Sequence, residues 1–274
     1  SLWAGASDHA MPQRTTPNVS PEAFVTQYLY HADELLDGIA PLDFMSAKRI
    51  ELDNETQRYE APSGEDELVF VCIAGEVDYA SGLNSGHARI MDMLYVPRHS
   101  CVALGGAPKG VLMQIASPSD RDTHFAHIVF SDVAKDPARH KVFGSAETGS
   151  LRDVYMCNDD KFEAARLLMG ICEGRPGGWT AWPPHEHAAE REELYVYFNM
   201  GNSFAVQFVY EDPEKPLFCG FVRDGDLVPI GKGFHPNVSS PAGRLVYFYA
   251  MAARTAGRRE FMTLNVQAGL GELR

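Results

Sequence analysis

The sequence predicts an all-β protein made of two barrel-like halves, and three observations support this fold class. Most of the chain consists of short apolar or alternating segments separated by Gly, Pro, Asn and Asp, as in a β-sandwich or barrel. A polar stretch with one Pro and two Gly, residues 131–150, interrupts this rhythm and indicates a connection between domains. The halves also share a Gly-bearing turn, a strand and a His, which indicates a duplication in which His99 corresponds to His235.

One helix is expected near the start of the chain. Ser20 can cap it, Pro21 suits its first position, and apolar residues recur at helical spacing until Gly38 ends the run. The segments after it that have strand character are residues 68–74, 90–96, 111–116, 127–130, 164–172, 193–198, 204–210, 217–222, 226–230 and 244–251.

These elements predict three parts of the chain. Residues 1–40 form an N-terminal segment with the helix. A first barrel covers residues 41–143, and a second barrel covers residues 144–274.

The composition excludes several classes of protein. With 274 residues, of which 45% are hydrophobic and 22% charged, the chain can bury a substantial core. A net charge of −13 argues against nucleic-acid binding, which rests on Lys and Arg. We expect no membrane span, because no apolar run reaches roughly 18 residues, and we see no secretory signal at the start. Five scattered cysteines predict free thiols in a reducing cytoplasm.

The stretch PPHEHAAEREELYVYF carries the residue types of a metal site. His185 and His187 are two residues apart, so on a strand both imidazoles point to the same side. His235 follows in GKGFHP, at a separation that suits a return strand of a barrel. Isolated histidines are often ordinary hydrogen-bonded residues, but here three coincide with a carboxylate. Three nitrogens and one oxygen suit Zn, Mn, Fe, Ni or Co.

Two adjacent glutamates compete as the carboxylate ligand. Glu193 shares strand parity with Tyr195 and Tyr197, whereas Glu192 shares it with apolar residues. If the metal lies on the polar, aromatic side of the sheet, Glu193 is the ligand. Irregular backbone before the strand would reverse the parity, so Glu192 stays open as an alternative.

The second half resembles the KduI/IolB family of bicupin sugar-acid isomerases. The similarity runs through GGWTAWPPHEH, EELYVYF, FAVQFVYED, VRDGDLVPIGKGFHP and RLVYFYAMAA, over residues 176–253. It implies two cupin barrels, which are double-stranded β-helix or jelly-roll barrels. It also implies one divalent metal per chain, with Zn favoured, held by His185, His187, Glu193 and His235.

The motifs resemble most closely the branch of 5-deoxy-glucuronate isomerase in inositol catabolism. ELYVYFN also resembles the sister branch, 5-dehydro-4-deoxy-D-glucuronate isomerase of pectin catabolism. Where the inositol branch usually reads Phe-Gln-Arg-Val-Tyr, this chain has Phe208 in place of the Arg. If that Arg binds substrate, the substrate of this protein differs.

The implied reaction moves a proton between neighbouring carbons of a sugar acid through an enediolate. A divalent metal stabilises the negative charge that gathers on oxygen, and a base removes the carbon-bound proton. Glu192, Tyr195 and metal-bound hydroxide are the candidate bases. Lys232 and Arg175 are candidates for holding the substrate carboxylate. The residues Tyr197 and Gln207 are also assigned to substrate binding.

Two other functions compete with the isomerase. An iron cupin dioxygenase uses the same four ligands, but it consumes oxygen. A non-catalytic sugar-binding or metal-binding cupin keeps the site and lacks turnover. For each, the expected partner is a small molecule. Exposed barrel edges also make a homo-oligomer the expected assembly.

Overall fold

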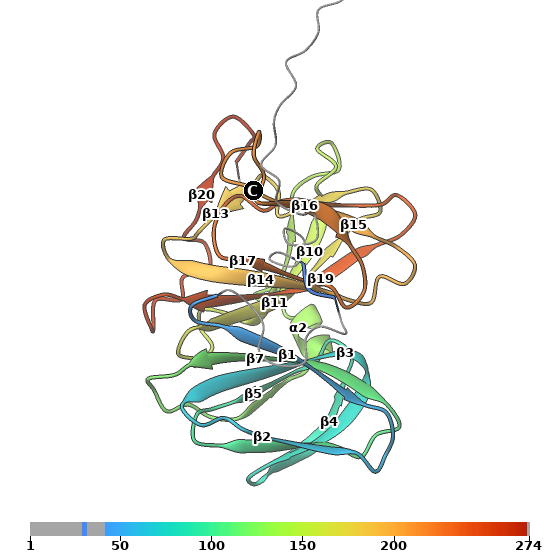
Figure 1. Ribbon diagram of the computed structural model, residues 1–274, viewed down its shortest axis with the longest axis vertical. Helices are drawn as coiled ribbons and strands as arrows, with labels where there is room; N and C mark the ends of the chain where they lie inside the picture. The colour runs from blue at the N-terminus through green and yellow to red at the C-terminus, as the bar shows by residue number, and fades with distance from the viewer. Residues whose placement is uncertain (1–28, 32–41, 273–274) are drawn as a thin grey trace, which may run out of the picture.

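The computed structural model describes residues 29–31 and 42–272, and it shows two β-barrels stacked on each other (Figure 1). The all-β prediction is confirmed. The helix expected from Ser20 to Gly38 lies mostly outside the described residues. In the part that is described, Tyr30 forms an antiparallel bridge with Leu227, so this piece pairs with a strand instead of a helix turn.

The first barrel is a sheet of eight antiparallel strands folded over on itself. Its main path runs β1-β7-β3-β5-β8, and the remaining strands pair around the second half of β3. The strands are β1 (Ser46–Leu52), β2 (Arg58–Pro62), β3 (Asp66–Ser81), β4 (Asn84–Arg89), β5 (Met93–Val96), β6 (Cys101–Gly105), β7 (Gly110–Pro118) and β8 (Ala126–Ile128). Because β3 pairs with β5 and β7 at its start and with β4 and β6 at its end, it connects both walls of the barrel.

The second barrel contains a six-stranded sheet, a four-stranded sheet and a two-stranded sheet, with the orders β17-β14-β19-β11-β10-β9, β12-β18-β15-β16 and β13-β20. The strands are β9 (His140–Phe143), β10 (Arg152–Asn158), β11 (Leu167–Gly174), β12 (Trp179–Thr180), β13 (His185–Glu186), β14 (Arg191–Tyr197), β15 (Ala205–Val209), β16 (Phe218–Val222), β17 (Leu227–Ile230), β18 (Asn237–Ser239), β19 (Leu245–Ala253) and β20 (Asn265–Val266). Each segment predicted as a strand overlaps one of the strands in these two barrels.

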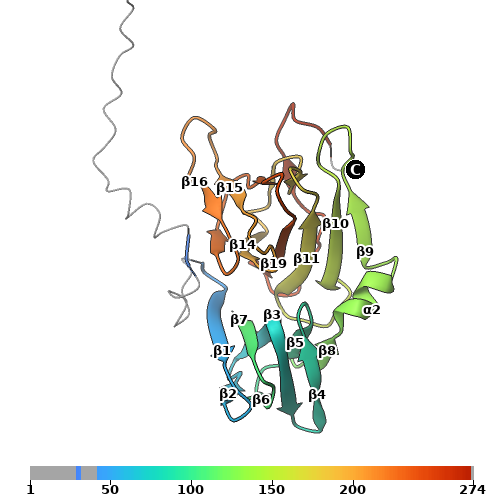
Figure 2. The ribbon, with the colours of Figure 1, turned by 90° about the vertical axis from the view of Figure 1, so that its right-hand side faces the viewer.

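The connection predicted over residues 131–150 is partly ordered secondary structure. It contains most of the helix α2 (Phe130–Lys135), which lies at the junction of the barrels, and all of β9 (Figure 2). The strand β9 pairs antiparallel with β10 and so belongs to the second barrel, although it precedes residue 144. Four residues are too short a segment for alternation to reveal, which is why the sequence suggested a loop.

Side-chain alternation divides the apolar residues of each large sheet between two cores. In β3, Leu68 and Phe70 point into the first barrel, where they join an apolar cluster. Val69 and Val71 point the other way and belong to the cluster that continues into the second barrel. The two large sheets therefore pack face to face, and apolar side chains fill the interior of the first barrel.

A buried carboxylate from the first barrel holds the start of β11. Glu67 in β3 is fully buried, and its oxygens accept the backbone N–H groups of Ala165, Arg166 and Leu167 at 2.7, 2.7 and 2.8 Å. The hydroxyl of Tyr95 donates a further hydrogen bond to it at 2.8 Å. Four donors satisfy the ionised carboxylate away from water, which is the condition for burying it.

A second carboxylate makes the reciprocal contact. Glu192 in β14 lies on the face turned toward the first barrel. It accepts the backbone N–H groups of Asp43 and Phe44 at 2.8 and 2.7 Å. Each barrel thus inserts one carboxylate among backbone donors of the other, and this fixes how the two sheets meet.

Replacing Glu67 by Ala is expected to lower the free energy of unfolding by about 3–5 kcal/mol, because three buried backbone donors lose their acceptor. Urea unfolding followed by tryptophan fluorescence measures this. The free energy of unfolding of Glu67→Gln should lie between those of the wild type and Glu67→Ala, since one acceptor oxygen remains.

Glu65→Ala is the matched control, because Glu65 is an exposed neighbour that faces His99 across 3.5 Å. Its cost should stay within about 0.5 kcal/mol. A loss below about 1 kcal/mol for Glu67→Ala would contradict a supporting role for this carboxylate.

Candidate metal centre and pocket

Four side chains converge inside the second barrel from three places in the chain. His185 lies in β13, and His187 follows directly after that short strand. Glu193 lies in β14 on the same face as Tyr195, so it points into the barrel. His235 lies in the turn before β18. The spacing of the histidine pair and the parity of the glutamate therefore bring together the groups that the sequence singled out.

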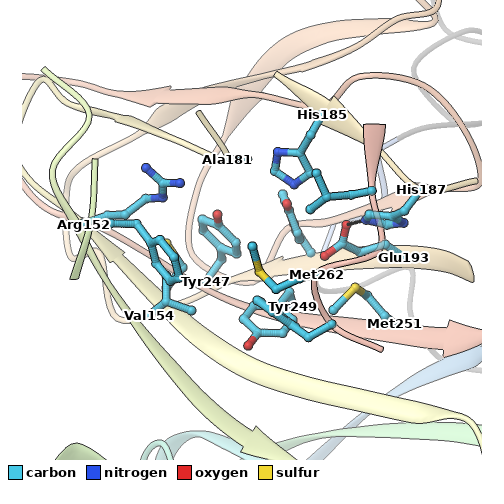
Figure 3. A pocket seen from close by; sticks show the side chains of 15 residues that line it. Arg152, Val154, Ala181, His185, His187, Glu193, Tyr247, Tyr249, Met251 and Met262 are labelled. Atoms are coloured by element: carbon cyan, nitrogen blue, oxygen red, sulfur yellow. Dashed lines mark hydrogen bonds and ion pairs between the residues drawn. The ribbon is translucent and has the colours of Figure 1, made fainter. Parts of the chain in front are cut away.

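The distances within this cluster suit one shared ion. One ring nitrogen of each of the three histidines lies within 4.8 Å of those of the other two. The Oε2 atom of Glu193 lies 2.9 Å from Nε2 of His187 and 3.1 Å from Nε2 of His235. Figure 3 shows His185, His187 and Glu193 directed at the same space. His187, Glu193 and His235 are all buried.

Backbone carbonyls lie beside Nδ1 of all three imidazoles. Nδ1 of His185 donates to the carbonyl of Pro183 at 3.0 Å, and Nδ1 of His235 donates to that of Gly233 at 2.8 Å. Nδ1 of His187 lies 3.4 Å from the carbonyl of Arg191, while its Nε2 lies 2.9 Å from Glu193. Because a carbonyl only accepts, the contacts at His185 and His235 place a proton on Nδ1 and leave Nε2 to face the cluster.

The Nε2 atoms of His187 and His235 face the carboxylate of Glu193, which only accepts hydrogen bonds when it is ionised. Nε2 of His235 is buried and makes no hydrogen bond within the described residues, although Glu193 lies beside it. An imidazole nitrogen and a carboxylate oxygen at 2.9 to 3.1 Å need a proton or a metal cation between them. The residues therefore fit a divalent metal, held by three Nε2 atoms and one carboxylate oxygen.

The pKa values of His185, His187 and Glu193 are shifted toward the metal-binding forms. Burial first, and then the neighbouring His235 and His187, lower the pKa of His185 to about 3. Burial also lowers the pKa of His187, although Glu193 opposes it. Burial works against ionisation of Glu193, but His187 and His235 outweigh it and hold the pKa of its carboxyl below the ordinary value. Neutral imidazoles and an ionised carboxylate are the ligand forms of such a site.

A pocket opens beside this cluster. Its cavity volume is about 80 Å³. His185, His187 and Glu193 form part of its wall. The remaining wall is mainly aromatic and apolar and includes Tyr195, Tyr247, Tyr249, Met251, Phe261 and Met262. Arg152 is the one arginine in the lining.

Three of the predicted site residues lie away from this pocket. Glu192 is on the opposite face of β14, where it binds the backbone of the first barrel. Lys232 is exposed and forms an ion pair with Glu211 at 2.6 Å. Arg175 pairs with Asp153 at 2.7 Å. Strand parity excludes Glu192, and nearness in sequence to the metal ligands was a poor guide for the two cations.

Tyr197 and Gln207 are buried below the metal centre and do not line the pocket. The Tyr197 hydroxyl donates to Oε1 of Gln207, and Asn237 donates to both at 3.0 and 3.1 Å. Nε2 of Gln207 donates to the backbone carbonyl of His235 at 2.8 Å. These two residues hold the backbone of His235 in place, instead of contacting a substrate as predicted.

Phe208 does not reach the pocket either. It lies on the outer side of its sheet, stacked on Trp179 with ring centroids 5.9 Å apart. Its neighbour Gln207 points inward and is fully buried. Phe208 therefore does not contribute to the pocket wall, and an effect of this position on the substrate stays a prediction.

The sequence contained signals for the pocket residues that were missed. Tyr247 and Tyr249 alternate along β19, opposite Tyr197 and Tyr195 of β14, so their register places them on the same inner face. Arg152 precedes Val154 by two residues in β10, and both line the pocket. The strand β10 went unrecognised because it directly follows the polar stretch.

The first barrel has no matching cluster among residues 42–143. Leu68 in β3 pairs with Val96 of β5, just as Glu193 pairs with Ile230 of β17. An apolar side chain therefore occupies the place of the carboxylate ligand. His99, the counterpart of His235, is exposed.

In the described parts of the chain, no helix has the length and apolar character needed to cross a membrane.

Comparison with known sequences identifies related proteins. The model of the KduI/IolB family matches residues 21–267. The 5-deoxy-glucuronate isomerase of Geobacillus kaustophilus is 36% identical over 85 residues, which cover 28% of this chain and only 30% of that protein. The 5-deoxy-glucuronate isomerase of Shouchella clausii is 23% identical over 232 residues, 78% of this chain and 83% of that protein. The 4-deoxy-L-threo-5-hexosulose-uronate ketol-isomerase 1 of Rhizobium meliloti is 26% identical over 140 residues, 50% of this chain and 47% of that protein.

Solved structures with the same fold include an IolB-like protein from Salmonella typhimurium. It has a TM-score of 0.75 at 18% identity, and the match covers 89% of this chain and 98% of that chain. The oxalate decarboxylase of Lactobacillus farciminis matches with a TM-score of 0.58 at 12% identity, over 82% of this chain and 85% of that chain. At these identities the likeness concerns the fold, and it agrees with the double barrel predicted from the sequence.

Metal affinity is predicted to depend only weakly on pH between about pH 7.5 and about pH 6. Three imidazoles with an ordinary pKa would lose about 50-fold in affinity over this range, because protons compete with the ion. Lowered pKa values at His185 and His187 keep these rings neutral as the pH falls. A loss of less than about tenfold is expected from competition titrations with a chelator.

Circular dichroism of the metal-free protein at both pH values is the control for folding. A loss of about 50-fold or more with the fold intact would show that the imidazoles titrate as if exposed to water.

Proposed function

The chain belongs to the KduI/IolB family, and on this premise we propose that it is a metal-dependent aldose–ketose isomerase of a uronate-type sugar acid. The observation that carries the proposal is the cluster of His185, His187, Glu193 and His235 beside a mainly aromatic and apolar pocket, whose wall includes the first three of these residues. A cluster of this kind supports chemistry in which negative charge develops on substrate oxygen, away from bulk water.

The reaction transfers a proton between two neighbouring carbons through an enediolate. A divalent metal in this cluster would supply Lewis-acid stabilisation of the negative charge on oxygen. The four residues that would hold the metal converge on one point. The carbonyl contacts at Nδ1 keep the imidazole rings from turning. Tyr247, Tyr249 and Met251 exclude water from the space beside them.

Tyr195 is the residue that we assign to stabilising the charge that develops on substrate oxygen. Its ring lies 5.8 Å from that of His235, it lines the pocket, and its hydroxyl makes no hydrogen bond within the described residues. Burial, and next the charge of Glu193, raise the pKa of this hydroxyl well above its ordinary value. It is therefore protonated at neutral pH, and it donates a hydrogen bond to substrate oxygen as charge develops there.

The substrate proposed first is 5-deoxy-glucuronate. The Shouchella clausii relative with this activity in its name matches 78% of the chain, whereas the ketol-isomerase of Rhizobium meliloti matches 50%. The 4-deoxy-hexosulose-uronate substrate of the latter is the alternative. Zinc is the metal proposed first, since three imidazoles and one carboxylate form a common zinc site.

The five cysteines are unpaired, which supports a location in the cytoplasm. A homo-oligomer stays a prediction.

Metal-loaded protein is expected to convert 5-deoxy-glucuronate to its ketose without oxygen uptake. His235→Ala should lower kcat/KM by about 10³-fold or more, because it removes a metal ligand. Proton NMR of the aldehyde signal measures the conversion. An oxygen electrode separates isomerisation from dioxygenase chemistry.

His99→Ala serves as the control, since this exposed histidine lies in the first barrel. If metal-loaded protein converts none of the deoxy- and keto-uronates, the isomerase proposal fails and a sugar-binding cupin takes its place.

Tyr195→Phe should lower kcat by about 10²-fold while KM and metal content change little, since only one hydroxyl at the reacting centre is lost. Steady-state kinetics and metal analysis of the purified variant test this. Tyr59→Phe is the control, because Tyr59 lies in the first barrel, where its hydroxyl donates to Gln114. Unchanged kcat in Tyr195→Phe would remove Tyr195 from the mechanism.

A further inference from the structure

One buried arginine lies in the pocket wall on the side away from the metal centre. Arg152 is only 4% exposed, and Figure 3 shows it separated from His187 and Glu193 by the width of the pocket. Its guanidinium lies 5.7 Å from the ring of Phe143, which also lines the pocket. The pocket thus has a cluster of metal ligands at one end and a cation at the other.

The guanidinium of Arg152 is held in place but keeps free donors. Nη1 donates to the carbonyl of Ser150 at 3.0 Å, and Nη2 donates to the carbonyl of Trp182 at 2.7 Å. These two bonds occupy two of the five N–H groups of the side chain and fix the plane of its fork. Three N–H groups are left for other acceptors.

No acidic side chain of the described residues pairs with Arg152. The adjacent Asp153 points to the other face of β10, where it binds Arg175 and His140 at 2.7 Å each. The other deeply buried arginines make more hydrogen bonds to the protein, although Nε of Arg191 has no partner within the described residues. Arg191 donates to three backbone carbonyls, and Arg259 donates to three backbone carbonyls and a side-chain amide.

An unpaired guanidinium in an apolar wall is costly unless an anion completes it. The planar fork of Arg matches a carboxylate with two parallel hydrogen bonds, and a fixed fork loses little entropy on binding. The rest of the lining is aromatic, apolar or part of the metal centre. Arg152 is therefore the cationic side chain of the wall that can bind an anionic group away from the metal centre.

We propose that Arg152 binds the carboxylate of the substrate and thereby selects acids whose carboxylate lies at the opposite end of the carbon chain from the reacting carbonyl. This inference rests on the proposed function for the orientation of the substrate. It excludes 2-keto acids, in which both groups are neighbours and only one end of the pocket would be used. It also requires the open-chain form, because the two polar ends of the pocket must be reached together.

The test compares two unreactive open-chain ligands that differ in one group. L-Gulonate and D-glucitol have the same carbon chain and stereochemistry, but only the first carries a carboxylate. Their dissociation constants are measured by isothermal titration calorimetry on the full, zinc-loaded chain. Wild-type protein is expected to bind L-gulonate at least about tenfold more tightly, the range of a charge-assisted hydrogen bond.

Arg152→Gln should reduce this preference to within about twofold, and Arg152→Lys should retain part of it, because Lys keeps the charge without the fork. Arg175→Gln is the matched control, since Arg175 pairs with Asp153 outside the pocket. It should keep the wild-type preference. Zinc content and melting temperature are recorded for every variant.

Three results would overturn the assignment: no preference in the wild type, a preference unchanged in Arg152→Gln, or an equal loss in Arg175→Gln. A purely structural role of Arg152 would lower the melting temperature or zinc content but leave the ratio of the two affinities unchanged. If the preference depends on Arg152 but no uronate is turned over, the carboxylate site stands and the isomerase proposal fails. If uronates are turned over and the ratio is unaffected, only the role of Arg152 fails.

Discussion

The alternation of side chains along β14 is the constraint on which the rest of the structure depends. Two adjacent glutamates in this strand point in opposite directions. Glu193 enters the second barrel and lies against His187 and His235, whereas Glu192 leaves it and accepts backbone N–H groups of the first barrel. One strand thus places a candidate metal-binding carboxylate in the second barrel and a second carboxylate at the interface between the barrels, where it binds backbone N–H groups. A shift of the strand register by one residue would turn Glu193 away from the site and Glu192 away from the interface.

The metal centre is a place where the chain gives up stability for function. Nε2 of His187 and Nε2 of His235 both lie against one oxygen of the buried Glu193, and the His235 nitrogen makes no hydrogen bond within the described residues. The corresponding place in the first barrel is filled by Leu68, inside a wholly apolar cluster. The two barrels therefore differ in their interiors: the first has a packed core and the second has the candidate site, while the sheets between them share a single core.

The sequence predicted those parts of the site that depend on local spacing. The pair His185 and His187 and the parity of Glu193 follow from strand geometry, which needs no knowledge of tertiary structure. Lys232 and Arg175 lie outside the pocket lining and form ion pairs with Glu211 and Asp153, because position along the chain does not determine the direction of a loop side chain. Arg152 was missed because it belongs to β10, which directly follows the polar stretch and shows no clear strand pattern of its own.

Anomalous diffraction from crystals of the zinc-loaded protein, collected on both sides of the zinc absorption edge, tests the central claim most directly. The account predicts one peak per chain, about 2.0–2.2 Å from the Nε2 atoms of His185, His187 and His235 and from one oxygen of Glu193. It would be contradicted by an empty cluster in crystals grown with excess zinc. Coordination through Nδ1 or through Glu192 would contradict it equally.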